Sequence, residues 1–273
     1  GKNRMSGSGV ISAANVWCVF KHVSGRKVEA LREVSLDIPP GQFVCVVGRS
    51  GHGKSTLLRA LGGLNPLTAG EIYVGEQKIV GPSAERSMVF QDDTVFPWMR
   101  VRDNVEFGLK AQSIGTLERR RIADEWLERV DLVDFAESWP KELSGGMRKR
   151  VALATVFATG ANILLMDEPF GSLDYVTRLI LHGLLLDLWQ RTGHTIVFVT
   201  HDVEEALILA DRILIMRDGQ IVDDLMVNLE RPRDEEVRAQ SHAVQIIKTI
   251  VQHLGLVTAT QTQDQQNEEV VDT

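Results

Sequence analysis

The sequence predicts an α/β fold built on a parallel sheet. Three apolar runs of five residues each are followed by polar or glycine residues and then by a helical pattern: Phe43–Val47, Asn162–Met166 and Thr195–Val199. Such runs are typical of buried strands. The repeated order of strand, loop and helix indicates parallel strands covered by helices. Ligands of these sheets bind at the carboxyl ends of the strands, so we look for a site in the loops after the runs.

The remaining segments add a β part and a helical part to this sheet. Leu31–Ile38 alternates apolar and polar residues, as a half-exposed antiparallel strand does. Glu71–Val74 and Gln77–Val80 flank the pair Gly75-Glu76 and predict a hairpin. No strand candidate lies between about residues 92 and 160, which predicts an inserted helical segment. Its apolar residues at near-helical spacing are Leu117, Ile122, Trp126 and Val130.

We expect one main domain at residues 10–225, with a helical extension at 226–257. One face of that extension is predicted to carry Val244, Ile247, Val251 and Leu254. The polar and acidic segment 258–273 has the composition of a disordered tail. Residues 1–9 have no apolar run and are predicted to be neither a signal peptide nor part of the fold.

The composition excludes several classes of protein. Hydrophobic residues make up 44% and charged residues 25% of the 273 residues, the balance of a globular protein and not of a collagen-like, coiled-coil or disordered one. A net charge of −7 argues against nucleic acid as a partner. No apolar run reaches the roughly 18 residues of a membrane span. Cys18 and Cys45 lie in apolar stretches and are predicted to be buried free thiols in a reducing compartment.

The loop after Phe43–Val47 predicts a phosphate site. Gly48 to Ser55 reads GRSGHGKS, which fits the pattern G-x-x-x-x-G-K-[ST] and opens a predicted helix at Ser55–Leu61. Its glycines let successive backbone N–H groups point at phosphate oxygens, and the alternative is an ordinary glycine-rich turn. We expect Lys54 to bind the β- and γ-phosphates and Ser55 to bind Mg²⁺. The predicted ATP-binding residues here are Gly48, Arg49, Ser50, Gly51, His52, Gly53, Lys54, Ser55 and Thr56.

Four further polar residues are candidates for the same chemistry. Asp167 ends a buried strand and suits a ligand of Mg²⁺. Glu168 follows it and is placed to deprotonate an attacking water, although both acids could simply be solvated. His201, before a helix capped by Asp202, is predicted to bind the γ-phosphate. Gln91, at the end of a strand-like segment, is a candidate for binding Mg²⁺ or holding water.

A second anion site is predicted at Ser144, Gly145 and Gly146, which precede the helical stretch Arg148–Thr159. Two glycines at a helix start let a phosphate approach the backbone closely. The alternative is an ordinary N-cap. The sequence alone leaves open whether this site and the phosphate loop meet within one molecule.

Taken in order, these motifs resemble the ATP-binding subunit of ABC transporters. The segments GRSGHGKST, LSGGM, ILLMDEP and SLD, with Gln91 and His201, carry the resemblance, which covers roughly residues 9 to 225. It implies a P-loop NTPase of the ABC cassette fold, with a mixed central sheet, an antiparallel β subdomain and an inserted helical subdomain. The implied activity is hydrolysis of ATP with Mg²⁺. Met147 and Thr155 depart from the family pattern, which commonly has Gln and Arg there, and we assign no consequence to them.

The resemblance also implies partners. Two cassettes, identical or related, would hold ATP between the phosphate loop of one and the segment 144–146 of the other. Asp174 would lie near the dimer seam and link the two sites. Phe20 would stack on adenine, unless it is an ordinary strand aromatic.

The segment Gly81–Leu109 narrows the resemblance to the nitrate, sulfonate, taurine and bicarbonate importers. This implies a permease partner bound at Val95–Trp98, a solute-binding protein as an indirect partner, and a peripheral place on the cytoplasmic face of the membrane. The alternative for Val95–Trp98 is packing inside the helical insertion. The alternatives for the whole chain are a soluble ABC ATPase of repair or translation and a P-loop kinase. The sequence does not identify the solute.

Overall fold

The computed structural model describes residues 11–21, 25–91, 95–233 and 235–255. The segments 1–9 and 258–273, for which we predicted no fold, lie outside these ranges.

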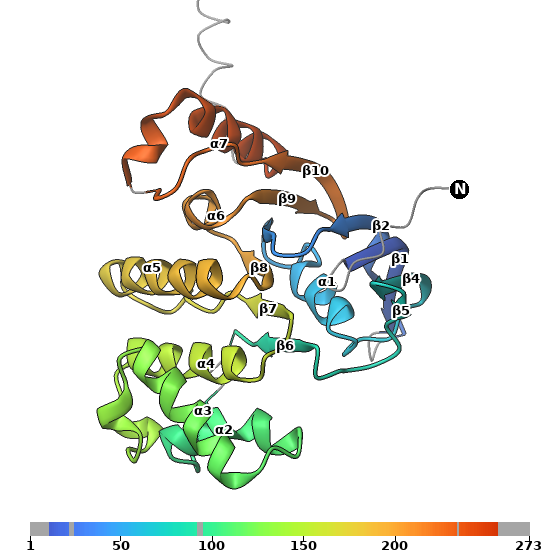
Figure 1. The fold of residues 1–273 in the computed structure, drawn as a ribbon. Coiled ribbons are helices and arrows are strands. Elements are labelled where there is room, and N and C mark those ends of the chain that lie inside the picture. Colours follow the sequence, from blue (N-terminus) through green and yellow to red (C-terminus); the bar gives the residue numbers. More distant parts are fainter. Residues whose placement is uncertain (1–10, 22–24, 92–94, 234, 256–273) are drawn as a thin grey trace, which may run out of the picture.

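A mixed six-stranded sheet forms the centre of the molecule (Figure 1). Its strand order is β10-β9-β3-β8-β7-β6, and β9, β3, β8, β7 and β6 run parallel while β10 is antiparallel to β9. The three predicted apolar runs are the adjacent strands β3, β8 and β7, so the predicted parallel sheet is confirmed. The bounds are β3 Phe43–Val47, β6 Arg86–Val89, β7 Ile163–Asp167, β8 Thr195–Thr200, β9 Arg212–Arg217 and β10 Gln220–Met226.

An antiparallel sheet of four strands, in the order β2-β1-β4-β5, lies beside the central sheet. The bounds are β1 Ile11–Lys21, β2 Lys27–Ile38, β4 Ala69–Val74 and β5 Gln77–Lys78. The predicted hairpin is therefore correct, but its second strand ends at Lys78 and not at Val80. Val80 is almost fully exposed, so no burial favours extending the strand to it.

Successive residues of the central strands enter two separate cores. Val44 and Val46 of β3 pack with α1 (Lys54–Leu61) and the antiparallel sheet, whereas Phe43, Cys45 and Val47 face the other helices. This alternation follows from the two-residue period of a strand. Cys18 and Cys45 are both free and buried, as predicted, and burial raises the pKa of each thiol.

The predicted helical insertion is confirmed, and it forms the lower lobe in Figure 1. It comprises α2 Val101–Ala111, α3 Thr116–Arg129, two short 3₁₀ helices and α4 Gly145–Ala158. The 3₁₀ helices are η1 Val133–Phe135 and η2 Pro140–Glu142. One apolar position of the prediction is wrong: Leu117 is 88% exposed. It precedes the buried Leu127 by ten residues, which places it about 80° away around the helix.

Three helices complete the chain. α5 (Tyr175–Thr192) and α6 (Val203–Leu209) cover the sheet on the side away from α1, and α7 (Ser241–His253) follows η3 (Glu235–Ala239) at the top of Figure 1. The buried face of α7 consists of Ala243, Ile246, Ile250 and, just after it, Leu254. The predicted face is therefore partly wrong, because Val244 is 50% exposed. Within the described ranges, every helix is too short or too polar to span a bilayer.

Candidate nucleotide-binding and hydrolytic site

A hollow of about 1100 Å³ opens at the carboxyl ends of β3, β6, β7 and β8. The structure therefore brings together most residues that the sequence nominated from separate loops. Those lining the hollow are Gly48, Arg49, Ser50, Gly51, Gly53, Lys54, Ser55, Thr56, Gln91, Glu168 and His201. His52 belongs to the same loop but does not line the hollow; its Nδ1 lies 3.4 Å from the carbonyl oxygen of Met216 in β9.

The phosphate loop is packed tightly against neighbouring backbone. A Cβ on Gly48 would lie 2.6 Å from the carbonyl oxygen of Met216, and one on Gly53 would lie 2.4 Å from that of Ala30. Gly53 also has φ of +96°, which side chains disfavour. These two glycines are thus required by sterics before any ligand is considered.

Lys54 fixes the centre of the loop. Its side chain is buried, and Nζ donates to the carbonyl oxygens of Gly48 at 2.9 Å and Arg49 at 3.1 Å. Burial lowers the pKa of Lys54, while Glu168 and Asp167 act in the opposite direction. The ammonium group of Lys54 is therefore held in place by backbone carbonyl oxygens of the loop itself.

Ser55 and Asp167 bring two side-chain oxygens together at the end of the phosphate loop. The Ser55 hydroxyl donates to Oδ1 of Asp167 at 2.9 Å, and the carboxylate is almost fully buried. Burial raises the pKa of Asp167, opposed by the Ser55 hydrogen bond and by Arg59. A hydroxyl and a carboxylate are the hard oxygen ligands that suit Mg²⁺, which takes its remaining ligands from phosphates and water. These residues fit the ion that the sequence predicted.

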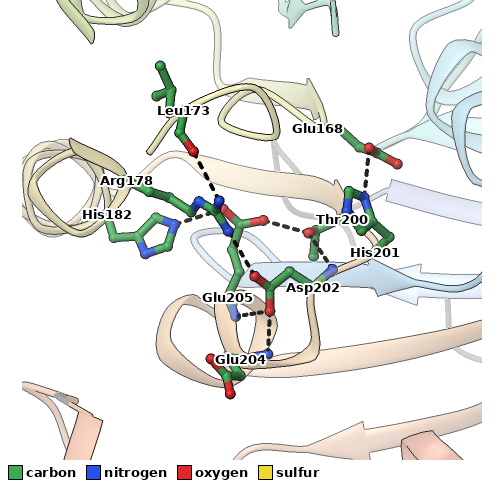
Figure 2. Close-up of polar contacts among 9 residues, drawn as sticks. All are labelled: Glu168, Leu173, Arg178, His182, Thr200, His201, Asp202, Glu204 and Glu205. Carbon is green, nitrogen blue, oxygen red and sulfur yellow. Dashed lines mark hydrogen bonds and ion pairs between the residues drawn. The ribbon is translucent and has the colours of Figure 1, made fainter. Parts of the chain in front are cut away.

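Glu168 and His201 both line the hollow and contact each other directly (Figure 2). Oε2 of Glu168 lies 2.9 Å from Nδ1 of His201, and Oε1 lies 3.8 Å from Nζ of Lys54. The backbone of Glu168 has φ of +43°, an uncommon value for a residue with a side chain. Its N–H donates to the carbonyl oxygen of Val199 at 3.0 Å, which ties the start of this loop to strand β8. The imidazole of His201 is 62% exposed and so open to a ligand.

A polar network behind His201 was only partly predicted. Asp202 caps α6 as expected, with Oδ1 accepting from the N–H groups of Glu204 at 2.9 Å and Glu205 at 3.3 Å. Glu205 is the third residue of α6, where the side chain of a capping box would accept the N–H of the N-cap residue. Its carboxylate is instead buried against the Thr200 hydroxyl and Nε2 of His182. A histidine 23 residues away is not visible to local pattern analysis.

The predicted second anion site lies elsewhere in the chain. Ser144 caps α4, with Oγ accepting from the N–H of Met147 at 3.2 Å. Ser144 and Gly146 line a smaller hollow of about 330 Å³ beside α5, and none of residues 144–146 is among the described residues that line the large hollow. Asp174 caps α5, with Oδ1 accepting from the N–H of Thr177 at 3.0 Å. Within one chain the two predicted phosphate sites therefore do not meet.

Some residues that line the large hollow were not predicted from the sequence to belong to a site. Phe20 is partly exposed and pairs across the sheet with Val28, and it is Val28 that lines the hollow. Arg32 from β2 also lines it and donates from Nε to the carbonyl oxygen of Asp218 at 2.9 Å. Leu254, just after α7, adds an apolar side chain there. Stacking of Phe20 on adenine stays a prediction.

The predicted docking patch at Val95–Trp98 needs correction. Val95 is buried in the core and cannot contact a partner, whereas Trp98 is 68% exposed. Trp98 lines a groove of about 490 Å³ whose other walls come largely from α2. Of the four residues in the predicted patch, this groove is lined by Trp98 alone, and whether a permease binds here stays a prediction. Its lining residues are Trp98, Met99, Asp103, Glu106, Phe107, Lys110, Ala111 and Arg119.

Comparison with known proteins identifies the family. The family described as "ABC transporter" matches residues 31–171. This chain belongs to the ABC transporter family. It is 50% identical over 211 residues to the nitrate import ATP-binding protein NrtD of Synechocystis sp., covering 77% of this chain and 79% of that protein. It is 40% identical over 254 residues to the aliphatic sulfonates import ATP-binding protein SsuB of Mycobacterium avium, covering 93% of this chain and 94% of that one.

A solved ATP-binding cassette, MJ0796, has the same fold as this ABC chain. It was determined as a dimer in a post-hydrolysis state bound to ADP and Pi, and it matches with a TM-score of 0.72 at 32% identity. The match covers 81% of this chain and all of the other. The predicted ABC cassette fold and ATPase activity are thereby confirmed. The relatives support an importer ATPase over a repair or translation ATPase.

Proposed function

We propose that this ABC ATPase powers an importer for a small anionic solute, nitrate, a sulfonate or a related ion such as taurine or bicarbonate. The names of its relatives, nitrate import and aliphatic sulfonates import proteins, support this class of solute. The chain would work at the cytoplasmic face of the membrane with permease subunits, and through them with a solute-binding protein. The observation that carries the hydrolytic part is the convergence of Lys54, Glu168 and His201 on one hollow.

The phosphate end of the hollow would bind ATP through backbone N–H groups and Lys54. Lys54 already lies among carbonyl oxygens, so little rearrangement is needed for its ammonium to face the β- and γ-phosphates. Ser55, Asp167 and Gln91 would hold Mg²⁺. When bound, Mg²⁺ supplies neutralisation of the charge on the β- and γ-phosphate oxygens.

Glu168 would accept the proton of the attacking water. Its carboxylate faces the hollow between Lys54 and His201, and the contact with His201 fixes one oxygen while leaving the other directed toward Lys54. His201 is the more exposed of the pair and would donate a hydrogen bond to the γ-phosphate. Glu168 would thus serve in proton transfer, and His201 would stabilise charge on the γ-phosphate.

A second chain would complete each site. Because residues 144–146 lie away from the phosphate loop of their own chain, we propose that they contact the ATP held by a partner cassette. The dimeric state of the solved cassette supports this arrangement. Asp174, at the start of α5 beside these residues, would lie near the seam between the two chains.

The test of the hydrolytic role is Glu168→Gln. We expect the turnover number to fall by about 10²–10⁴-fold, the usual contribution of a general base, because the amide cannot take a proton. ATP binding should persist, and ATP should trap a stable dimer. Steady-state ATPase assays and size-exclusion chromatography with ATP measure both. Glu118→Gln on the exposed face of α3 is the matched control and should behave as wild type. Wild-type turnover in Glu168→Gln would remove Glu168 from this role.

The test of the permease partner is Trp98→Ala. We propose that the groove at Trp98 receives the permease, because it combines exposed aromatic surface with charges at its edges. Truncating a central interface aromatic costs about 2 kcal/mol or more, roughly a 30-fold loss of affinity. Recovery of permease subunits, identified by mass spectrometry from solubilised membranes, should fall while ATPase activity of the isolated chain is unchanged. Trp139→Ala, outside the groove, is the control, and equal recovery from both variants would contradict the proposal.

A further inference from the structure

We infer that Arg178 and His182 of α5 are positioning residues that hold the loop carrying His201 and tie it to the segment Leu173–Asp174. The inference rests on the proposed role of His201 in hydrolysis. Neither residue lines the hollow at the phosphate loop, so neither touches the reacting groups. Their contacts instead reach the two residues that flank His201 (Figure 2).

Arg178 joins two loops through one guanidinium. Nη1 donates to Oδ2 of Asp202 at 3.0 Å, and Nη2 donates to the carbonyl oxygen of Leu173 at 3.1 Å. Asp202 directly follows His201, and Leu173 directly precedes the cap of α5. Nε of Arg178 is buried and has no hydrogen-bond partner among the described residues. An unpaired buried donor costs free energy, which the hydrogen bonds to Asp202 and Leu173 must offset.

His182, one turn further along α5, acts on the other neighbour of His201. Its Nε2 lies 2.7 Å from Oε1 of Glu205, and the other oxygen of Glu205 accepts from the Thr200 hydroxyl. The Thr200 hydroxyl oxygen in turn accepts the N–H of Asp202 at 3.0 Å. His182 and Glu205 are both buried. A buried carboxylate in this position needs donors, and His182 and Thr200 supply them.

The imidazole of His182 donates to Glu205 through Nε2. Its Nδ1 is buried without a partner among the described residues, so a proton there would be an unsatisfied buried donor. The proton therefore resides on Nε2, which donates to Glu205. An amide can replace such a donor, whereas an alkyl side chain cannot.

These contacts determine where His201 can lie. In the described part of the chain, the side chain of His201 has one polar partner, Glu168, and is mostly exposed. Its position is thus set mainly through Thr200 and Asp202, which both connect to α5. Since α5 starts at Asp174, a displacement of the segment 173–174 moves Arg178 and His182 with it. Dimer contacts at that segment would therefore reach His201 through a rigid helix.

The first experiment is a double-mutant cycle between Arg178→Ala and His201→Ala. Misplacing a functional group by about 1 Å can cost up to about 100-fold in rate, so we expect Arg178→Ala to lower kcat by about 10- to 100-fold. KM for MgATP should change by less than about threefold, because Arg178 does not contact nucleotide. In the His201→Ala background the same substitution should change kcat by less than about twofold. Arg178→Lys, which keeps a cation for Asp202, should recover part of the loss.

The second experiment compares His182→Gln with His182→Leu. Glutamine can still donate to Glu205, so kcat should stay within about threefold of wild type. Leucine removes the donor and should lower kcat as Arg178→Ala does. Arg191→Ala, which breaks an exposed ion pair with Asp187 on the same helix, is the control and should leave kcat unchanged. A lowered Tm with wild-type kcat in Arg178→Ala and His182→Leu would overturn the inference and leave both residues purely structural.

The cycle separates failure of the inference from failure of the proposed function. Wild-type turnover in His201→Ala would remove the role of His201 and with it the basis of the inference. If His201→Ala instead loses turnover and Arg178→Ala multiplies that loss independently, His201 keeps its role and the positioning role is wrong.

Discussion

The two phosphate-facing regions of this chain differ in how completely one molecule builds them. At the phosphate loop, Lys54 is buried among carbonyl oxygens, and Glu168 and His201 approach from two other loops. At the start of α4, Ser144 contributes a cap for its own helix, and Gly145 and Gly146 carry no side chain. The first region is a preorganised pocket, whereas the second is a helix edge without such a pocket. In the proposed dimer this edge would contact the phosphate held by the partner, so each chain would supply one half of two sites.

The largest expected effect on ATP affinity comes from breaking the preorganised region with Lys54→Ala. The substitution removes a charge facing phosphate and both hydrogen bonds that hold the loop. A hydrogen bond to a charged group is worth about 1.5–3 kcal/mol, so ATP affinity of the isolated chain should fall by about 10- to 150-fold. Isothermal titration calorimetry measures this. Lys78→Ala on the exposed strand β5 is the control, and unchanged affinity in Lys54→Ala would contradict the predicted phosphate grip.

A smaller and more selective effect is expected at the helix edge from Gly145→Ala. The added Cβ would meet only Leu173 Cδ2 at 3.5 Å and Arg148 Nη2 at 4.0 Å, which is ordinary contact, so Tm should not fall. The methyl group would hinder close approach of a partner's phosphate to the backbone. We expect ATP affinity of the single chain to be unchanged and ATP-dependent dimerisation, measured in the Glu168→Gln background, to weaken about tenfold.

Gly146→Ala is the matched comparison for that experiment. Its Cβ would lie 2.7 Å from Cγ2 of Thr177, so the contact between α4 and α5 must shift and Tm should fall. Thr177→Ser removes that methyl group and should restore Tm. If Gly145→Ala dimerises with ATP as wild type does, the helix edge is not a phosphate site.

The contrast between the two regions also marks what the sequence could predict. The strands β3, β7 and β8 and the loops after them follow from runs of apolar residues whose period and termini are local, so their shared edge could be predicted. Glu205 could not be assigned, because its partner His182 is distant in the chain and only the packing of α5 on α6 brings them together. The exposure of Val244 was missed because the apolar face of α7 is broad, and the pattern alone does not show that its buried centre lies at Ala243, Ile246 and Ile250 with Val244 at the edge.

The smallest effect is expected for Asp167→Asn, which should raise the thermal stability of the chain while weakening its binding of ATP. Burial raises the pKa of Asp167, so this group favours the folded state at low pH and loses that contribution as pH rises through the raised value. At neutral pH its charge is therefore a cost, which Mg²⁺ would offset when bound. The neutral amide should raise Tm of the nucleotide-free chain, by about 2–4 °C for each kcal/mol relieved, and weaken Mg²⁺-dependent ATP binding.

Asp174→Asn is the control of opposite sign. Hydrogen bonds from Thr177 lower the pKa of Asp174, so its charge favours the folded state at neutral pH and that contribution is lost as pH falls. Thermal unfolding at pH 7 without nucleotide should therefore show a higher Tm for Asp167→Asn and a lower Tm for Asp174→Asn. A lower Tm for Asp167→Asn would mean that the Ser55 hydrogen bond outweighs the burial of the carboxylate. In that case the pair of Ser55 and Asp167 is stable without Mg²⁺, and these proposed metal ligands are preorganised as Lys54 is.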